Sequence, residues 1–189
     1  DAEESYGWDV GIEQYLFDKR FVVGATWFEN TYIDLIDWVL VNPWAFTGQY
    51  RNVGEAFSHG LELEAAWEPV DAVRFEANYT YTKARDLIAD VDLASRPRHK
   101  CSFHTIVKPI ENLSVDLGCR VVGKRRETFG PDDNWNATYM VWDLSGTYDI
   151  TENLQVFGSW KNMFDEKYED IWGYGTYGCS VYGGVKVSF

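Results

Sequence analysis

The last nine residues of the chain alternate strictly between two kinds of side chain. Val or Gly fills each odd position from 181 to 187 and Phe189 closes the row, while Lys186 and Ser188 lie between them. Successive side chains point to opposite faces in an extended strand, so this pattern predicts a β-strand with one apolar face. Residues 73–82 and 113–121 repeat the pattern. We therefore expect an all-β protein.

The connections between such segments alternate between short and long. Tight turns are expected at 17–19, 68–71, 109–112 and 150–153, and loops of ten residues or more at about 37–53, 85–96, 126–136 and 164–179. Short turns at one rim and long loops at the other are typical of an outer-membrane barrel. The sequence thus predicts a transmembrane antiparallel up-and-down β-barrel. The nine predicted strands are residues 4–16, 20–34, 54–67, 72–84, 97–108, 113–125, 137–149, 154–163 and 180–189.

Composition excludes several other classes of protein. Aromatic residues make up 17% of the chain, yet the mean hydropathy is -0.34 and the longest apolar run, Trp38–Val41, is far shorter than the roughly 20 residues of a spanning helix. A net charge of -13 argues against a nucleic-acid partner. Cys101, Cys119 and Cys179 have no spacing that indicates a disulfide framework or a zinc site.

Strand parity makes a further prediction. A complete bacterial barrel has an even number of strands with both ends at the short-turn rim, so nine strands ending at that rim put residue 1 on the long-loop side. We expect this chain to be the C-terminal part of the barrel domain, residues 1–189, with the first strands and any plug preceding Asp1.

The polar faces of the predicted strands carry charged residues that would line the barrel lumen. A soluble β-sandwich would place the same residues on its solvated surface, so the alternatives differ in which face meets lipid. The predicted lumen residues are Glu62, Glu64, Arg74, Glu76, Lys100, Asp116, Arg120, Asp143 and Lys186.

Two short motifs are weak. Residues 173–178 match the dinucleotide fingerprint GxGxxG, but a strand and not a helix follows, so we reject it. Asp132, Asn134 and Asn136 resemble part of a calcium loop, although Ala137 replaces the required glycine. A polar turn explains them as well. No catalytic residues, no cofactor and no firm metal site are expected.

The closing row of residues resembles the C-terminal assembly signal of outer-membrane proteins. In that signal the last strand is offered as an unpaired edge to the barrel-assembly machinery, which would be a partner of this chain. The residues of the row are Val181, Val185, Val187 and Phe189, with Gly183 between them.

Four motifs, in matching order, are similar to the TonB-dependent receptor family. Residues 162–168, Asn-Met-Phe-Asp-Glu-Lys-Tyr, resemble its N-L-F-D-x-x-Y motif with Met163 in place of Leu. Residues 52–64 resemble its N-x-G…G-x-E stretch, 79–84 its Y-T-Y-T-x-A segment, and 96–100 its R-P-x-H segment. Cys179 occupies a position at which this family often has arginine. The likeness is closest to the cobalamin and ferric-siderophore receptors.

This resemblance implies a 22-stranded barrel closed by an N-terminal plug that is absent from this chain. It implies an outer-membrane receptor that imports a large scarce nutrient, a ferric siderophore or cobalamin, with energy from TonB acting through the absent N-terminal region. The alternative is a passive outer-membrane channel or structural barrel without a plug. Large planar ligands favour aromatic surfaces, although loop packing would use the same residues. The candidate ligand contacts are Trp38, Trp44, Phe46, Trp135, Trp172, Tyr174 and Tyr177.

Overall fold

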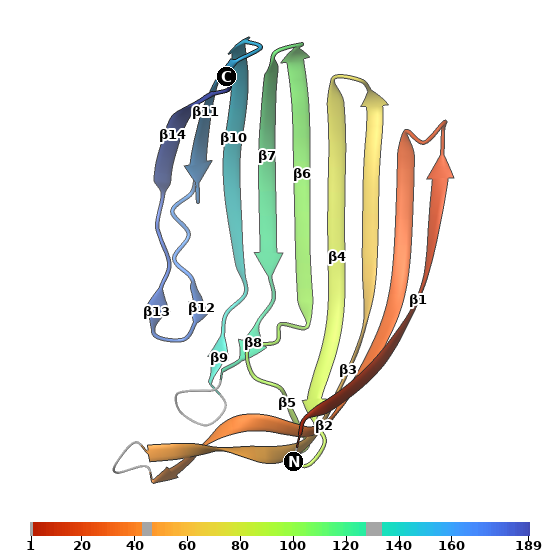
Figure 1. Ribbon diagram of the computed structural model, residues 1–189, viewed down its shortest axis with the longest axis vertical. Helices are drawn as coiled ribbons and strands as arrows, with labels where there is room; N and C mark the ends of the chain where they lie inside the picture. The colour runs from red at the N-terminus through yellow and green to blue at the C-terminus, as the bar shows by residue number, and fades with distance from the viewer. Residues whose placement is uncertain (1, 43–46, 128–133) are drawn as a thin grey trace.

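One antiparallel sheet makes up most of the protein (Figure 1). The computed structural model describes residues 2–42, 47–127 and 134–189. Nine strands cross the sheet in sequence order, each antiparallel to the next, which confirms the predicted all-β, up-and-down wall. They are β1 (Glu4–Leu16), β2 (Phe21–Asn42), β3 (Thr47–Val70), β4 (Val73–Asp86), β6 (His99–Ile110), β7 (Leu113–Val122), β10 (Tyr139–Thr151), β11 (Leu154–Lys161) and β14 (Ser180–Val187).

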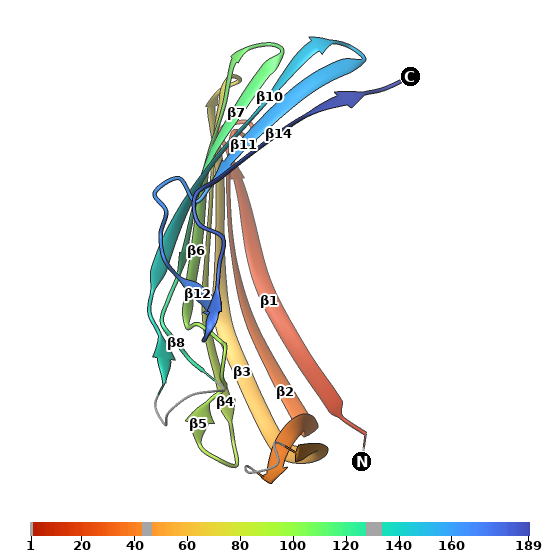
Figure 2. The ribbon, with the colours of Figure 1, turned by 90° about the vertical axis from the view of Figure 1, so that its left-hand side faces the viewer.

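The sheet is bent into part of a barrel wall (Figure 2). Such bending follows from the twist that every strand carries. Within the described ranges, β1 pairs only with β2, and β14 only with β11. The N- and C-terminal ends lie at opposite rims of the sheet (Figure 1). No helix in this part of the chain is long and apolar enough to cross a membrane.

The strand register places the predicted lumen residues on one face. Residues paired across an antiparallel ladder project to the same side of the sheet. Glu62 pairs with Thr80, and Thr80 with Lys100; farther along, Arg120 pairs with Val141. Following the pairs from β3 to β14 brings the whole predicted set to this polar face, namely Glu62, Glu64, Arg74, Glu76, Lys100, Asp116, Arg120, Asp143 and Lys186.

The opposite, apolar face has no second layer against it. Val181 and Ile12, from the two sides of the sheet, are 74% and 72% exposed, whereas the buried apolar cluster found among the described residues, Val122, Tyr139 and Val141, lies on the polar face. No second sheet large enough to cover this face occurs among the described residues. The described residues therefore do not form the β-sandwich of the alternative prediction. An exposed apolar surface of this extent indicates a membrane or another partner.

The prediction of a loop at residues 37–53 is wrong, because most of this segment is paired β-strand. Residues 37–53 were expected as a loop, but β2 and β3 continue as a paired ribbon past the ends of their neighbours, with Trp38 opposite Tyr50 (Figure 1). A bulge bends the ribbon where Asp34 (φ 55°) and Gly54 (φ 120°) take left-handed conformations. A φ of 120° is strained for any residue with a side chain, which favours glycine at position 54, and a Cβ there would also overlap the end of the Ile88 side chain.

Two other long loops contain small sheets of their own. β8 (Arg125–Arg126) pairs with β9 (Trp135–Asn136), and β12 (Glu169–Ile171) pairs with β13 (Tyr174–Gly175). β5 (Val91–Asp92) adds to the outer part of β4. Main-strand ends otherwise differ from the prediction by a few residues; for example, β14 ends at Val187 and leaves Phe189 beyond it.

Candidate functional site at the loop rim

The loop between β11 and β14, residues 162–179, is fixed to the barrel wall by Asn162. This side chain is buried, and its Oδ1 accepts the backbone N–H of Glu166 at 2.8 Å. Its Nδ2 donates to the carbonyls of Glu166 at 3.0 Å and Tyr177 at 3.3 Å. A φ of 48° suits asparagine, which tolerates the left-handed region better than most residues. One side chain thus joins both ends of the loop.

Two carboxylates complete this anchor. Asp143, a predicted lumen residue on β10, accepts the backbone N–H of Asn162 at 2.8 Å and lies 3.2 Å from Lys161 Nζ. Asp165 accepts Lys167 Nζ at 2.8 Å and the backbone N–H of Cys179 at 2.9 Å. The hydrogen bond from Lys167, then that from Cys179, lowers the pKa of Asp165. The N-x-x-D part of the motif therefore closes the loop.

The tyrosine of the same motif packs against the wall. Tyr168 stacks on Tyr139 at the start of β10, with ring centroids 4.2 Å apart. Arg120 donates to Tyr168 Oη at 3.3 Å, and its guanidinium lies 5.8 Å from the Tyr139 ring centroid. Offset ring packing with a cation nearby is favourable. The 162–179 loop is consequently held over the polar face.

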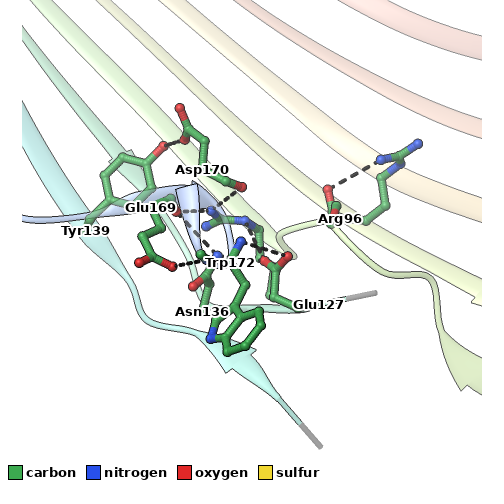
Figure 3. A network of polar contacts seen from close by, with 10 residues as sticks. Arg96, Glu127, Asn136, Tyr139, Glu169, Asp170 and Trp172 are labelled. Atoms are coloured by element: carbon green, nitrogen blue, oxygen red, sulfur yellow. Dashed lines mark hydrogen bonds and ion pairs between the residues drawn. The ribbon is translucent and has the colours of Figure 1, made fainter. Parts of the chain in front are cut away.

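A buried polar network joins this loop to the one before it (Figure 3). Arg125 on β8 donates through Nη2 to the carbonyls of Glu169 and Asp170, the latter at 2.7 Å, and its Nε lies 3.5 Å from Glu127. Asn136 donates to Glu127 Oε1 at 2.7 Å. Buried charges need such partners to offset their desolvation. The two small hairpins are therefore coupled.

Two pockets flank this junction on the polar face. One, of about 430 Å³, is lined by Lys100, Arg120, Arg125, Tyr139 and Asp170 among others. The second, of about 700 Å³, lies between Arg120 and the loop that carries Tyr177. Both fall within the range of small-molecule sites. They give the rim a surface of tyrosines and cations beside the predicted lumen.

The structure brings together only some of the aromatic residues predicted to contact a ligand. Trp172, Tyr174 and Tyr177 all lie on the 162–179 loop, and Tyr177 is 85% exposed. Trp38 lies on the separate β2–β3 ribbon. Trp135 is on the preceding loop, with Lys124 Nζ 5.6 Å from its ring centroid. Trp44 and Phe46 lie outside the described residues.

The calcium candidates are only partly described. Asp132 lies outside the described residues; Asn134 accepts the N–H of Glu127 through its carbonyl, and the Asn136 amide belongs to the network above. Among the residues that the structure describes, no group of three or more His, Cys, Asp or Glu side chains could hold a metal ion. Calcium in this loop stays a weak prediction.

Arg74, at the short-turn end of the polar face, forms ion pairs with two nearby glutamates. It pairs with Glu68 and, at 2.6 Å, with Glu76. Of the predicted assembly signal, Val181, Val185 and Val187 project to the same face of β14, which pairs with β11 among the described residues. Its recognition by assembly machinery stays a prediction.

The sequence reasoning missed Arg125, Glu127, Tyr139 and Asp170. A run of Lys124-Arg125-Arg126-Glu127 between two strands was visible, but charged runs in loops are usually solvated. Only the packed hairpins show that two of these charges are buried.

Solved outer-membrane receptors share this fold. The chain superposes with a TM-score of 0.81 on the copper transporter OprC, at 21% identity over 99% of this chain and 31% of that one. A ferric enterobactin receptor from Pseudomonas aeruginosa, PfeA, gives 0.78 at 23% identity over 99% and 32%. The ferric-catecholate import receptor Fiu from E. coli gives 0.74 at 20% over 99% and 28%. The chain thus spans less than a third of the length of these structures.

A sheet of this form, apolar on one face and looped at one rim, defines part of an outer-membrane β-barrel. Residues 1–163 match the family model of the TonB-dependent receptor-like β-barrel. The chain belongs to this family, and it is an outer-membrane protein of Gram-negative bacteria. The family resemblance drawn from the sequence motifs is thereby confirmed.

Proposed function

We propose that the protein to which this barrel wall belongs imports a ferric siderophore across the outer membrane with energy from TonB. The observation that carries the proposal is the family match over residues 1–163, combined with an aromatic loop fixed over a polar face. Solved structures of similar fold include ferric-siderophore receptors and a copper transporter. Cobalamin, the other nutrient implied by the motifs, is an outcome of the test below.

In this proposal the two faces of the sheet have separate tasks. The row that includes Ile12 and Val181 meets lipid, and the row that includes Glu76 and Lys186 lines the lumen around a plug. The 162–179 loop then lies at the outer rim, where Trp172, Tyr174 and Tyr177 contact the nutrient. The polar pockets beneath the loop lie on the path from the nutrient site toward the lumen.

Uptake by a strain that lacks the full-length gene tests the proposal. Transport of ⁵⁵Fe as ferric enterobactin, ⁵⁵Fe as a ferric trihydroxamate, labelled cobalamin and copper should be measured with and without a plasmid copy. We expect restored uptake of at least one ferric siderophore, which is lost again when TonB is deleted. Restored cobalamin or copper uptake alone would reassign the nutrient, and TonB-independent uptake would favour the passive channel.

Loop variants locate the nutrient contacts. Replacing Trp172 and Tyr174 together by alanine should raise the Kd at least tenfold, since stacked aromatic contacts contribute about 1 kcal/mol each beyond burial. Phe17→Ala, an exposed aromatic in the short turn at the other rim, is the matched control and should leave Kd unchanged. Equal affinity of the loop variant and wild type would remove these residues from the ligand site.

A further inference from the structure

Two basic runs that are distant in sequence meet at the loop rim. Residues 96–100 read Arg-Pro-Arg-His-Lys and residues 124–126 read Lys-Arg-Arg. β6 begins where β7 ends, and the N–H of Gly123 donates to the carbonyl of His99 at 2.8 Å. The hairpin therefore concentrates cations at one place in a chain whose net charge is -13.

Part of this cluster lies on the apolar face. His99 and Cys101 pair with Tyr81 and Tyr79 of the apolar row, and Cys101 also pairs with Val121. The His99 ring stacks on Tyr79, with centroids 6.1 Å apart, and is tilted against Tyr81, with centroids 5.4 Å apart. Aromatic side chains with polar tips mark the level of lipid headgroups in membrane proteins.

A pocket of about 560 Å³ opens at this level. Val121 and Cys101 of the apolar row line it together with Arg98, Lys124 and Trp135, and Lys100 of the polar face also reaches it. Asp92 is its one carboxylate and accepts Arg98 Nη2 at 2.6 Å. A guanidinium has five N–H donors, so this carboxylate does not saturate Arg98. A lining that combines apolar side chains with cations suits an anionic amphiphile.

We propose that this pocket binds a phosphate-bearing lipid of the outer leaflet. The phosphate lies against Arg98 and Lys124, and the first acyl carbons lie along Val121 and Cys101. Charge complementarity selects the headgroup, and continuity with the apolar row selects a membrane lipid over a soluble phosphate. The pocket adjoins the 430 Å³ pocket of the polar face, with which it shares Lys100, Cys101 and Val121, but Arg98 and Lys124 line neither of the two polar pockets. This lipid site depends on one part of the proposed function, namely that the apolar row of the sheet faces the membrane lipid.

The test uses the full-length receptor, delipidated in a maltoside detergent. Affinities for diphosphoryl lipid A and for chemically dephosphorylated lipid A are measured by thermophoresis. We expect the phosphorylated form to bind at least tenfold more tightly. Removing both charges in the Arg98→Gln, Lys124→Gln variant should weaken its binding about 25-fold, at about fivefold for each basic residue near a lipid surface.

Three further measurements separate the possible readings. The Lys19→Gln, Lys108→Gln variant removes two charges at the short-turn rim and should bind within twofold of wild type. Trp135→Ala removes apolar contact without charge, so it should weaken both lipids alike. Heat-modifiable gel mobility shows whether each variant barrel is folded. If the double variant does not fold, Lys124→Gln alone replaces it, and its affinity for diphosphoryl lipid A should fall about fivefold.

Equal binding of the two lipids to wild type would overturn the proposal, as would equal losses in the two charge variants. Competition by millimolar inorganic phosphate would assign the pocket to soluble phosphate. Nutrient uptake should persist in the Arg98→Gln, Lys124→Gln variant. Absent uptake in wild type, with lipid binding intact, would contradict the proposed function and leave this site standing.

Discussion

Replacing Asn162 by alanine should release the 162–179 loop without unfolding the barrel. The substitution removes three hydrogen bonds from a side chain that is only 4% exposed. At about 1 kcal/mol net for each bond, the docked loop loses about 3 kcal/mol relative to the open loop. Because 1.4 kcal/mol is a factor of ten, opening becomes on the order of 100-fold more frequent.

Hydrogen exchange in the full-length receptor measures this opening directly. Amides of residues 166–178 should exchange on the order of 100-fold faster in the variant, up to the limit of the unprotected rate, while β6 and β7 stay unchanged. Asn162→Asp keeps the acceptor for Glu166 and should have a smaller effect. Asn153→Ala, which removes an exposed amide at the opposite rim, is the control.

Two results would refute this reasoning. Unchanged exchange in residues 166–178 would mean that other contacts dock the loop. Faster exchange throughout the wall would mean that Asn162 stabilises the barrel and not the loop. An additional Asn162→Gly variant isolates the side-chain contribution, because glycine accepts the positive φ at no steric cost.

Two further predictions concern pH and packing. The lowered pKa of Asp165, caused first by Lys167, means that loop docking is strongest above the ordinary aspartate pKa and is lost as pH falls through the lower, folded value. Tryptophan fluorescence from pH 6 to 2 should therefore show a loop transition that Asp165→Asn abolishes, and a transition retained in that variant would contradict the assignment. Gly60→Ala would place a Cβ 2.1 Å from the Tyr81 carbonyl oxygen, so it should destabilise the wall by about 1–3 kcal/mol and lower the temperature of the heat-modifiable transition. Gly24→Ala, with its nearest neighbour at 3.8 Å, should be tolerated, and equal shifts for the two variants would refute the packing argument.

The strands of the sheet were predictable because the alternation of apolar and polar residues within each segment identifies its two faces. Alternation in residues 73–82 and 113–121 is a property of single segments, and pairing merely aligns them. The β2–β3 ribbon was missed because Trp38–Val41 is a continuous apolar run with no alternation, which periodicity cannot assign. The pairing of residues 38–40 with residues 48–50 depends on a bulge that only the assembled sheet reveals.

The candidate site was predictable only in outline. The motif at 162–168 marked the right loop, and the roles of Asn162 and Asp165 follow from hydrogen bonds to backbone groups far along the chain. Arg125 and Glu127 carry no comparable signal, because their burial comes from a neighbouring hairpin. Contacts between two loops depend on how close the sheet brings them, and no pattern within either loop predicts the distance between the loops.

The alternation of the wall also governs which changes in length the protein can accept. One residue inserted directly before Glu76 in β4 would carry Glu76 and every later side chain of that strand to the opposite face of the sheet. Two inserted residues would restore the assignment. A strand can therefore change length by a single residue only where a bulge absorbs the extra residue, as in the β2–β3 ribbon, whereas the segments at the loop rim obey no such parity and can change length in any step.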